Sequence, residues 1–358
     1  MNKNRIFYYD VLRSIAIIGI VFCHVATSFV LTGVNSSTFY ISAFFDCFRD
    51  FSIPIFVMLS GALLVNKRDS LKTFFKKRLS RIFIPFIFWA IIYIIYSSAY
   101  IKHTFDFSSA IDIFFGTSGT LGVAFWFIWM IVIIYIGIFL INKIIEFGCK
   151  KRENFSNEFI AVLTLLALAY ISCSDFGLFS PYTPKLLYFA SFLSYIIIGY
   201  FIANNELIGN KINSKIIIIV TLLGSCCLYS YYIFGFVVPQ SISANHFVYR
   251  GYFNLLLLAL AVDIFVLFKY LSKTKYLRGL EESYFGNAII NLSKYSFGLY
   301  LCHYLILYIL RLNLFGFYHG WNPLVSILML VILTVSISLL VLWVLSKIPY
   351  LDKFTGKS

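Results

Sequence analysis

The chain has 358 residues, of which 61% are hydrophobic, 20% are aromatic and only 12% are charged. Soluble domains are usually about 25% charged, so this composition excludes a soluble globular protein and indicates a multi-pass membrane protein. The net charge of +14 does not require a nucleic-acid partner, because contact between basic loops and anionic membrane lipids accounts for it.

Ten apolar stretches are long enough to span a membrane, since a helical span needs about 20 residues. The sequence shows no internal repeat, and no long polar linker separates the stretches. We therefore expect an all-α polytopic membrane protein with one transmembrane domain over residues 1–358 and no appended soluble domain. The stretches lie near residues 11–31, 44–65, 82–101, 122–142, 158–173, 186–204, 215–233, 247–268, 295–312 and 323–346.

The basic residues predict the orientation of these spans. Most of the 29 lysines and arginines fall at the two chain ends and in alternate connecting segments. Segments rich in lysine and arginine stay on the cytoplasmic side of a membrane. This bias fits an even number of spans with both termini in the cytoplasm.

The first span contains three ionisable residues, Asp10, Arg13 and His24, and such groups are costly inside a bilayer. Eleven residues separate Arg13 from His24, which is about 20° past three full helical turns, so both lie on one face. They are roughly 16 Å apart along the helix axis. The spacing predicts a fixed cation at the membrane surface and a titratable base in the interior, along a reaction path across part of the bilayer.

A second basic feature follows the second span, where Arg78 and Arg81 stand three residues apart. At this spacing two side chains share one face of a helix. Two guanidinium groups can hold a phosphate or pyrophosphate by paired hydrogen bonds. The same charges also fit a cluster that only orients the helix. No group of His, Cys and acidic residues has metal-ligand spacing, so we expect no metal.

Five motifs, taken together and in this order, resemble those of the acyltransferase family 3 of integral membrane acyltransferases. The resemblance extends over nearly the whole chain. One departure stands out: relatives often have a histidine just before the tryptophan segment, where this chain has Gly122-Val123-Ala124, so its acceptor is expected to be positioned differently. The five motifs are Asp10-x-x-Arg13 with His24, Ile55–Gly61, Arg78-Leu79-Ser80-Arg81, Phe125-Trp126-Phe127 and Ser296–His303.

The resemblance implies transfer of an acyl group, usually acetyl, from cytoplasmic acyl-CoA to a hydroxyl of a carbohydrate or lipid-linked glycan at the outer side of a bacterial cytoplasmic membrane. Acetyl-CoA is then the donor, and Arg78 and Arg81 are the candidates for contact with its phosphates. Arg13 would line the entry, held by Asp10. His24 would either take the proton of the sugar hydroxyl or attack the thioester and carry the acyl group itself.

Four further residues are expected to contact substrate: Ser60, Trp126, Tyr300 and His303. Tyr300 lies one turn before His303 on the same helix face. His303 either faces the same cavity as His24 or ties two helices together. Trp126 either lines a pocket or packs among other aromatic residues.

Other acidic residues within the spans leave two interpretations open. Asp46, Arg49 and Asp50 lie at the outer end of the second span. They either bind an acceptor sugar or form a local ion pair. Asp263, in the eighth span, is expected to face the bundle interior or a cavity.

The competing hypothesis is a secondary transporter or an export component for a polysaccharide precursor. Such proteins also use intramembrane His, Asp and Arg, and they bind substrate near the membrane midplane. The sequence shows neither inverted repeats nor a pair of matching interrupted spans. Transfer or hydrolysis of a labelled acetyl group by the purified protein would distinguish the enzyme from a transporter.

Overall fold

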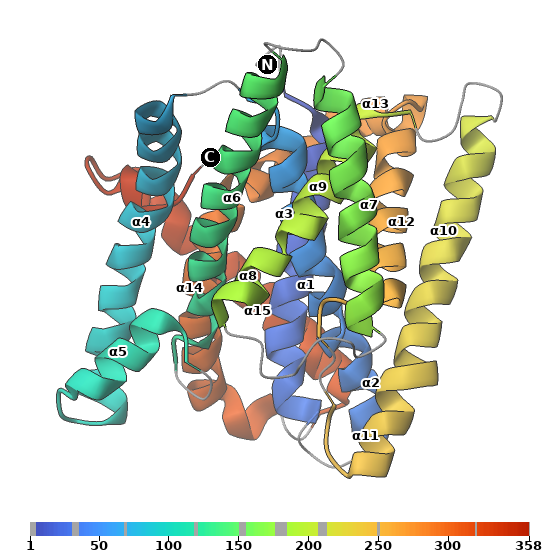
Figure 1. The fold of residues 1–358 in the computed structure, drawn as a ribbon. Helices are drawn as coiled ribbons and strands as arrows, with labels where there is room; N and C mark the ends of the chain where they lie inside the picture. Colours follow the sequence, from blue (N-terminus) through green and yellow to red (C-terminus); the bar gives the residue numbers. More distant parts are fainter. Residues whose placement is uncertain are drawn as a thin grey trace. The chain divides into compact units, whose positions relative to one another are not determined.

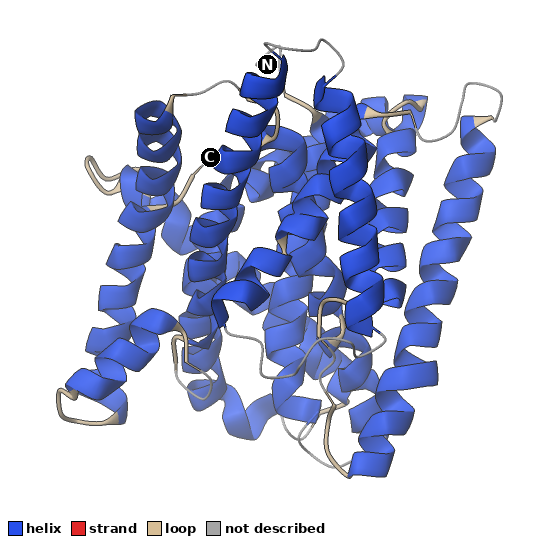
Figure 2. Ribbon diagram, in the orientation of Figure 1, coloured by secondary structure: helices blue, strands red, loops and turns tan. Residues whose placement is uncertain are grey.

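The computed structural model describes residues 5–30, 36–67, 70–117, 121–149, 155–175, 185–206, 213–248, 251–318 and 321–357. Every regular element within these ranges is a helix, and none is a strand (Figure 2). The prediction of an all-α protein is confirmed.

In the described part of the chain, nine helices are long and apolar enough to cross a membrane, and the number rises to ten if one bent helix pair is counted as a single span. This agrees with the ten predicted stretches. The cytoplasmic location of both termini stays a prediction of the charge pattern. The nine helices are Phe7–Val30, Ser37–Leu64, Lys72–Ile101, Val123–Cys149, Phe155–Ser174, Leu186–Asn204, Ser214–Ala244, Tyr284–Leu314 and Pro323–Leu345, and the bent pair is Leu255–Leu271 with Lys275–Glu281.

Four helix starts differ clearly from the prediction, those of the second, third, eighth and ninth spans, which begin at Ser37, Leu71, Leu255 and Tyr284. The third and the eighth show the physical reason. The third span extends back to Leu71, because the side chain of Ser70 caps the helix by accepting a hydrogen bond from the Thr73 amide. The eighth begins only at Leu255, since the side chain of Asn254 caps it there. Caps, rather than hydrophobicity, therefore decide these two starts.

The chain forms two compact units, which are described separately below. The first comprises residues 1–68 and 136–293, and the second comprises residues 69–135 and 294–358. Two helices, α6 (Trp126–Cys149) and α14 (Tyr284–Tyr318), contribute residues to both units. The single transmembrane domain stays a prediction.

In the first unit, α3 packs against α1, α9 and α12, while α10 packs against α12 and α7 against α9 (Figure 1). The remaining short elements connect these helices. The helices wholly within this unit are α1 (Phe7–Val30), α2 (Ser37–Asp46), α3 (Phe48–Leu64), α7 (Phe155–Asp175), α8 (Lys185–Ser191), α9 (Leu193–Asn204), α10 (Ser214–Tyr231), α11 (Val238–Ala244), α12 (Leu255–Leu271) and α13 (Lys275–Glu281).

Glycines set the distance between α3 and α9. A Cβ atom on Gly61 would lie 2.0 Å from the carbonyl oxygen of Ile196. A Cβ atom on Gly199 would lie 2.3 Å from the carbonyl oxygen of Met58. Membrane helices gain no hydrophobic free energy from leaving lipid, so close backbone contact at small residues holds them together.

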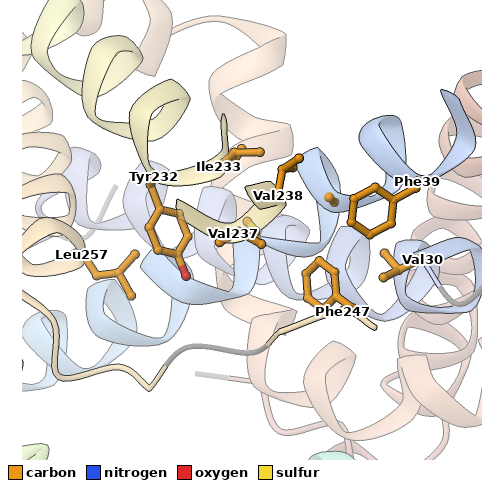
Figure 3. Packing of buried hydrophobic residues seen from close by; sticks show 10 residues of the cluster. Val30, Phe39, Tyr232, Ile233, Val237, Val238, Phe247 and Leu257 are labelled. Atoms are coloured by element: carbon orange, nitrogen blue, oxygen red, sulfur yellow. The ribbon is translucent and has the colours of Figure 1, made fainter. Parts of the chain in front are cut away.

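An apolar cluster joins several helices of the first unit (Figure 3). Figure 3 shows Val30, Phe39 and Phe247 at one end of the cluster and Tyr232 and Leu257 at the other. The cluster links α1 and α2 to the π-helical turn η3 (Tyr232–Val237) and to α11. Its buried members are Val30, Phe39, Ala43, Cys47, Tyr232, Ile233, Val237, Val238, Phe247 and Leu257.

The second unit contains the long helix α4, with the C-terminal segment of the chain folded back onto it. The ring of Phe354 stacks on that of Phe88, with centroids 4.5 Å apart. The elements of this unit are α4 (Leu71–Tyr96), the π-helical turn η1 (Ser97–Ile101), α5 (Phe107–Phe115), the 3-10 turn η2 (Val123–Phe125), α15 (Pro323–Leu345), the 3-10 turn η4 (Asp352–Phe354) and parts of α6 and α14.

We predict that Gly61→Ala and Gly199→Ala each lower the thermal unfolding midpoint of the protein purified in detergent. The added methyl group would meet a backbone carbonyl, and overpacking of this kind typically costs about 1–3 kcal/mol. Gly279→Ala is the matched control, because Gly279 is an exposed helical glycine with nothing within 4 Å of the added Cβ. Equal midpoints for all three variants would contradict the close approach of α3 and α9.

Candidate functional site

A charged network in the first unit surrounds Asp10, which is buried near the start of α1. Arg5 donates two hydrogen bonds to its carboxylate, from Nε to Oδ2 at 2.6 Å and from Nη2 to Oδ1 at 2.7 Å. The Ser293 hydroxyl of α14 donates a third, to Oδ1 at 2.6 Å. Arg13 Nη1 donates to the same serine at 3.3 Å. Asp10 therefore holds Arg5 directly and is linked to Arg13 through Ser293.

This arrangement refines the expectation that Asp10 holds Arg13. Arg5 stands just before the helix, where its planar guanidinium group reaches both carboxylate oxygens, and paired bonds of this kind are the strong ones. With three donors, Asp10 is a positioning group that fixes the start of α1 on α14. Ser14 strengthens the same junction, because its hydroxyl donates to the carbonyl of Ile289 at 3.1 Å.

His24 lies on α1, half-buried, three turns beyond Arg13. Thr27, one turn further, donates its hydroxyl hydrogen bond to Asp46 Oδ1 of α2 at 2.6 Å. The Sγ atom of Cys23 lies 3.9 Å from the same oxygen. Asp46 is fully buried, and its other oxygen has no hydrogen-bond partner among the described residues. A buried carboxylate thus packs against the turn of α1 that carries His24.

The ion pair expected near Asp46 is confirmed. Arg49 Nε lies 3.2 Å from Asp50 Oδ1, and the Tyr232 hydroxyl donates to Asp50 Oδ2 at 2.8 Å. Asp50 is buried, and a buried ion pair needs such additional hydrogen bonds to offset its lost hydration. Asp263 is also bonded within the bundle, since Ser225 of α10 donates to its Oδ2 at 2.7 Å.

Ser60 also belongs to the first unit, on α3. Its side chain is half-buried, and its hydroxyl donates to the carbonyl of Phe56, one turn earlier, at 3.1 Å. Ser60 precedes Gly61, so it stands beside the contact between α3 and α9. A role in substrate binding stays a prediction.

The second unit holds Trp126, Tyr300 and His303. The Tyr300 hydroxyl donates to the carbonyl of Ala124, which ties α14 to the turn before α6. Trp126, half-buried, is the first residue of α6. His303 is fully buried, and its Nδ1 lies 2.7 Å from the carbonyl oxygen of Tyr300. Tyr300 thus links two elements, while both alternatives for His303 stay predictions.

Tyr93 of α4 adds a contact that no sequence signal indicated. Its hydroxyl donates to the carbonyl of Leu301 at 2.9 Å and accepts from the amide of Leu305 at 2.9 Å. In a regular helix these two backbone groups bond to each other. The phenol therefore bridges the turn of α14 that carries His303, and it fixes the local backbone there.

Arg81 lines a surface cavity of about 380 Å³ in the second unit. Arg78 is half-buried, and its Nε has no hydrogen-bond partner among the described residues. The structure thus places Arg81 at the cavity, while Arg78 is not part of the lining. Sequence reasoning missed Lys353 and Lys357, which join it from the chain's last residues. The full lining is Ser80, Arg81, Ile84, Ser346, Asp352, Lys353, Gly356 and Lys357.

A second cavity, of about 490 Å³, lies near the other end of α4. The π-helical turn η1 forms part of its wall, and π-helical turns are frequent at functional sites. Hydroxyl groups, a carboxylate and two tyrosines face it. The lining is Ser97, Ile101, Lys102, Ser109, Asp112, Ile113, Leu121, Val123, Tyr304 and Tyr308.

Comparison with protein families gives one match. A model of the acyltransferase family 3, described as an acyltransferase domain, matches residues 6–343. The chain belongs to this family. Comparisons with curated proteins and with solved structures gave no match. With nine or ten apolar helices among its described residues, this family 3 member is a multi-pass membrane acyltransferase.

Most of the residues described above lie within the matched region. It covers Asp10, Arg13 and His24 on α1 as well as Arg81 and His303. It ends before the C-terminal segment that brings Lys353 and Lys357 to the cavity of Arg81. That part of the cavity is therefore a feature of this acyltransferase beyond the family match.

The network around Asp10 predicts coupled effects on stability. Asp10→Asn and Ser293→Ala should each lower the thermal unfolding midpoint, because each leaves buried polar groups with fewer partners. Hydrogen bonds to charged groups contribute about 1.5–3 kcal/mol, so the loss from Ser293→Ala should be much smaller in the Asp10→Asn background. Strictly additive losses would show that the two side chains act independently. Ser172→Ala serves as the control, because the Ser172 hydroxyl donates to the carbonyl of Leu168 in its own helix, at 2.9 Å.

Proposed function

We propose that this protein is an O-acyltransferase of the bacterial cytoplasmic membrane, with both termini in the cytoplasm. It moves an acyl group, acetyl in the simplest case, from cytoplasmic acyl-CoA to a sugar hydroxyl of a surface glycan or a lipid-linked glycan. The observation that carries this proposal is the family match, which covers α1 with Arg13 and His24.

In the proposed reaction the sugar oxygen attacks the thioester carbonyl carbon and its proton passes to the neutral imidazole of His24. Collapse of the tetrahedral intermediate breaks the carbon–sulfur bond, and the leaving thiolate takes the proton from His24. Imidazole suits this exchange because it gains and loses a proton near neutral pH. In the alternative, His24 attacks the carbonyl first and expels the CoA thiolate. The sugar oxygen then attacks the acyl-imidazole, which frees His24, and the hydroxyl proton ends on the thiolate.

The residues around His24 fit positioning roles in this scheme. Ser293 orients the Arg13 side chain at one end of α1, and Asp10 anchors the same junction. Thr27 and Asp46 hold the turn just beyond His24. A base must be held within hydrogen-bond reach of the proton that it takes, and these contacts restrict the movement of α1 on either side of it.

For the acceptor we propose the 490 Å³ cavity of the second unit. Sugar hydroxyls both donate and accept hydrogen bonds, and Ser97, Ser109 and Asp112 offer both kinds of partner. Tyr304 and Tyr308 add apolar ring surface against which a sugar ring packs. A cavity of this size accommodates a small glycan rather than a protein loop.

One observation favours the second candidate, a transporter. The helices α12 and α13 form a span bent by 83°, and transporters bind substrate where helices are interrupted. The two functions differ in a simple measurement. The purified chain in lipid vesicles, with labelled acetyl-CoA and a lipid-linked glycan, should form acetylated glycan without another protein. Movement of glycan across the vesicle membrane with no acetylated product would favour the transporter. Product that needs a second protein would contradict direct transfer.

The decisive variant is His24→Ala. It should lower the rate of acyl transfer by about 10²–10⁴-fold, as loss of a positioned acid–base group does. The control is His246→Ala, because His246 is exposed and its Nδ1 lies 2.9 Å from the carbonyl oxygen of the nearby Ala244. Initial rates with labelled acetyl-CoA and equal unfolding midpoints would establish the effect. A folded His24→Ala protein with a normal rate would overturn the role of His24.

A further inference from the structure

Residues 354–356 pack against helices of the second unit. Thr355 is fully buried, and its carbonyl oxygen packs against Gly298 of α14. A Cβ atom on Gly298 would lie 1.9 Å from that oxygen, so only glycine leaves room for it. Gly356 adopts a φ of +62°, which favours glycine, and a Cβ atom there would lie 2.8 Å from the Phe297 ring. With the stacked rings of Phe354 and Phe88, these contacts seat the segment on α14 and α4.

This seating brings two lysines to an arginine distant in sequence. Lys353 and Lys357 line the 380 Å³ cavity together with Ser80 and Arg81 of α4. Asp352 is the one acidic residue of the lining, so three cationic side chains face one carboxylate. The cavity is open to solvent, and all four charged side chains are exposed.

Such a cavity has the chemistry of a phosphate site. Arginine binds phosphate through paired hydrogen bonds and lysine acts as a mobile point charge, so the two types complement each other around a polyphosphate. The excess of positive charge favours an anion of more than one charge. A cluster that merely orients a helix needs charge alone, not a closely fitted segment around a cavity.

We propose that this cavity binds phosphate esters, with Lys353 and Lys357 as binding residues beside Arg81. The inference rests on the proposed function for its ligand, which is then the nucleotide end of acyl-CoA. The same phosphate chemistry is offered by anionic lipid headgroups. The C-terminal segment thus completes the donor site, and the Gly298 contact is the device that holds it there.

The test is binding of CoA to the purified full-length chain in neutral detergent, measured by titration calorimetry. The double variant Lys353→Gln/Lys357→Gln should bind CoA about tenfold more weakly or worse, as loss of hydrogen bonds to charged groups predicts. Pantetheine, which lacks the phosphates, should bind the variant and the parent protein equally. Lys347→Gln is the matched control, since it precedes the same segment and is not part of the lining.

A second variant separates the segment's position from its charge. Gly298→Ala keeps both lysines but displaces the carbonyl of Thr355, so it should also weaken CoA binding while leaving that of pantetheine unchanged. An effect of the lysine variants without any effect of Gly298→Ala would contradict the role of the seated segment.

The lipid source is tested by the unfolding midpoint in phosphatidylglycerol and in phosphatidylcholine nanodiscs. A headgroup site predicts that the double variant loses the stabilisation by phosphatidylglycerol and keeps its affinity for CoA, which would overturn the donor assignment. If neither CoA binding nor lipid stabilisation changes, the cavity is not a phosphate site.

Failure of the inference and failure of the proposed function remain distinguishable. CoA binding that depends on the lysines, in a protein without transferase activity, would leave the inference in place and remove the function. Normal acyl transfer with an unchanged KM for acetyl-CoA in the double variant would leave the function in place and remove the inference.

Discussion

A charged group inside a membrane must find partners within the protein, because lipid offers none. The described helices meet this requirement repeatedly. Asp10 has Arg5 and Ser293, Asp50 has Arg49 and Tyr232, and the ammonium group of Lys269 donates to two backbone carbonyls. Each set joins separate elements, so the cost of burying the charge is offset by contacts that also hold the helices in place. The position of α1, and with it that of His24, depends on the two contacts of Asp10, with Arg5 and with Ser293.

Close backbone approach is the second organising interaction. Gly61 and Gly199 let α3 and α9 touch, and Gly298 admits the carbonyl of Thr355. Since apolar side chains are as well solvated by lipid as by one another, packing at short range decides which helices pair. The same small-residue contact thus serves a helix pair in the first unit and the docking of the C-terminal segment in the second.

In the second unit, α4 connects two cavities of different character. Arg81 lies in its first half and Ser97 directly follows its end, about 25 Å apart at the rise of a helix. The first cavity is cationic, and the second carries hydroxyl and tyrosine side chains. Between them, the hydroxyl of Tyr93 holds the turn of α14 that contains His303. The two cavities therefore differ in the chemistry that they offer along α4 and the π-helical turn that follows it.

The sequence by itself determined the helices and the family. The apolar stretches marked the spans because crossing a bilayer demands length and hydrophobicity, and the spaced motifs indicated the family that the match confirmed. It also offered a local ion pair among Asp46, Arg49 and Asp50 as one of two alternatives, and the structure shows the pair between Arg49 and Asp50, which are neighbours in the chain. Only the tertiary structure decided that Asp10 holds Arg5, that Tyr93 bridges α14, and that Lys353 and Lys357 meet Arg81. These contacts depend on which helix faces approach each other and on where glycines let backbones touch, and neither follows from local hydrophobicity or charge.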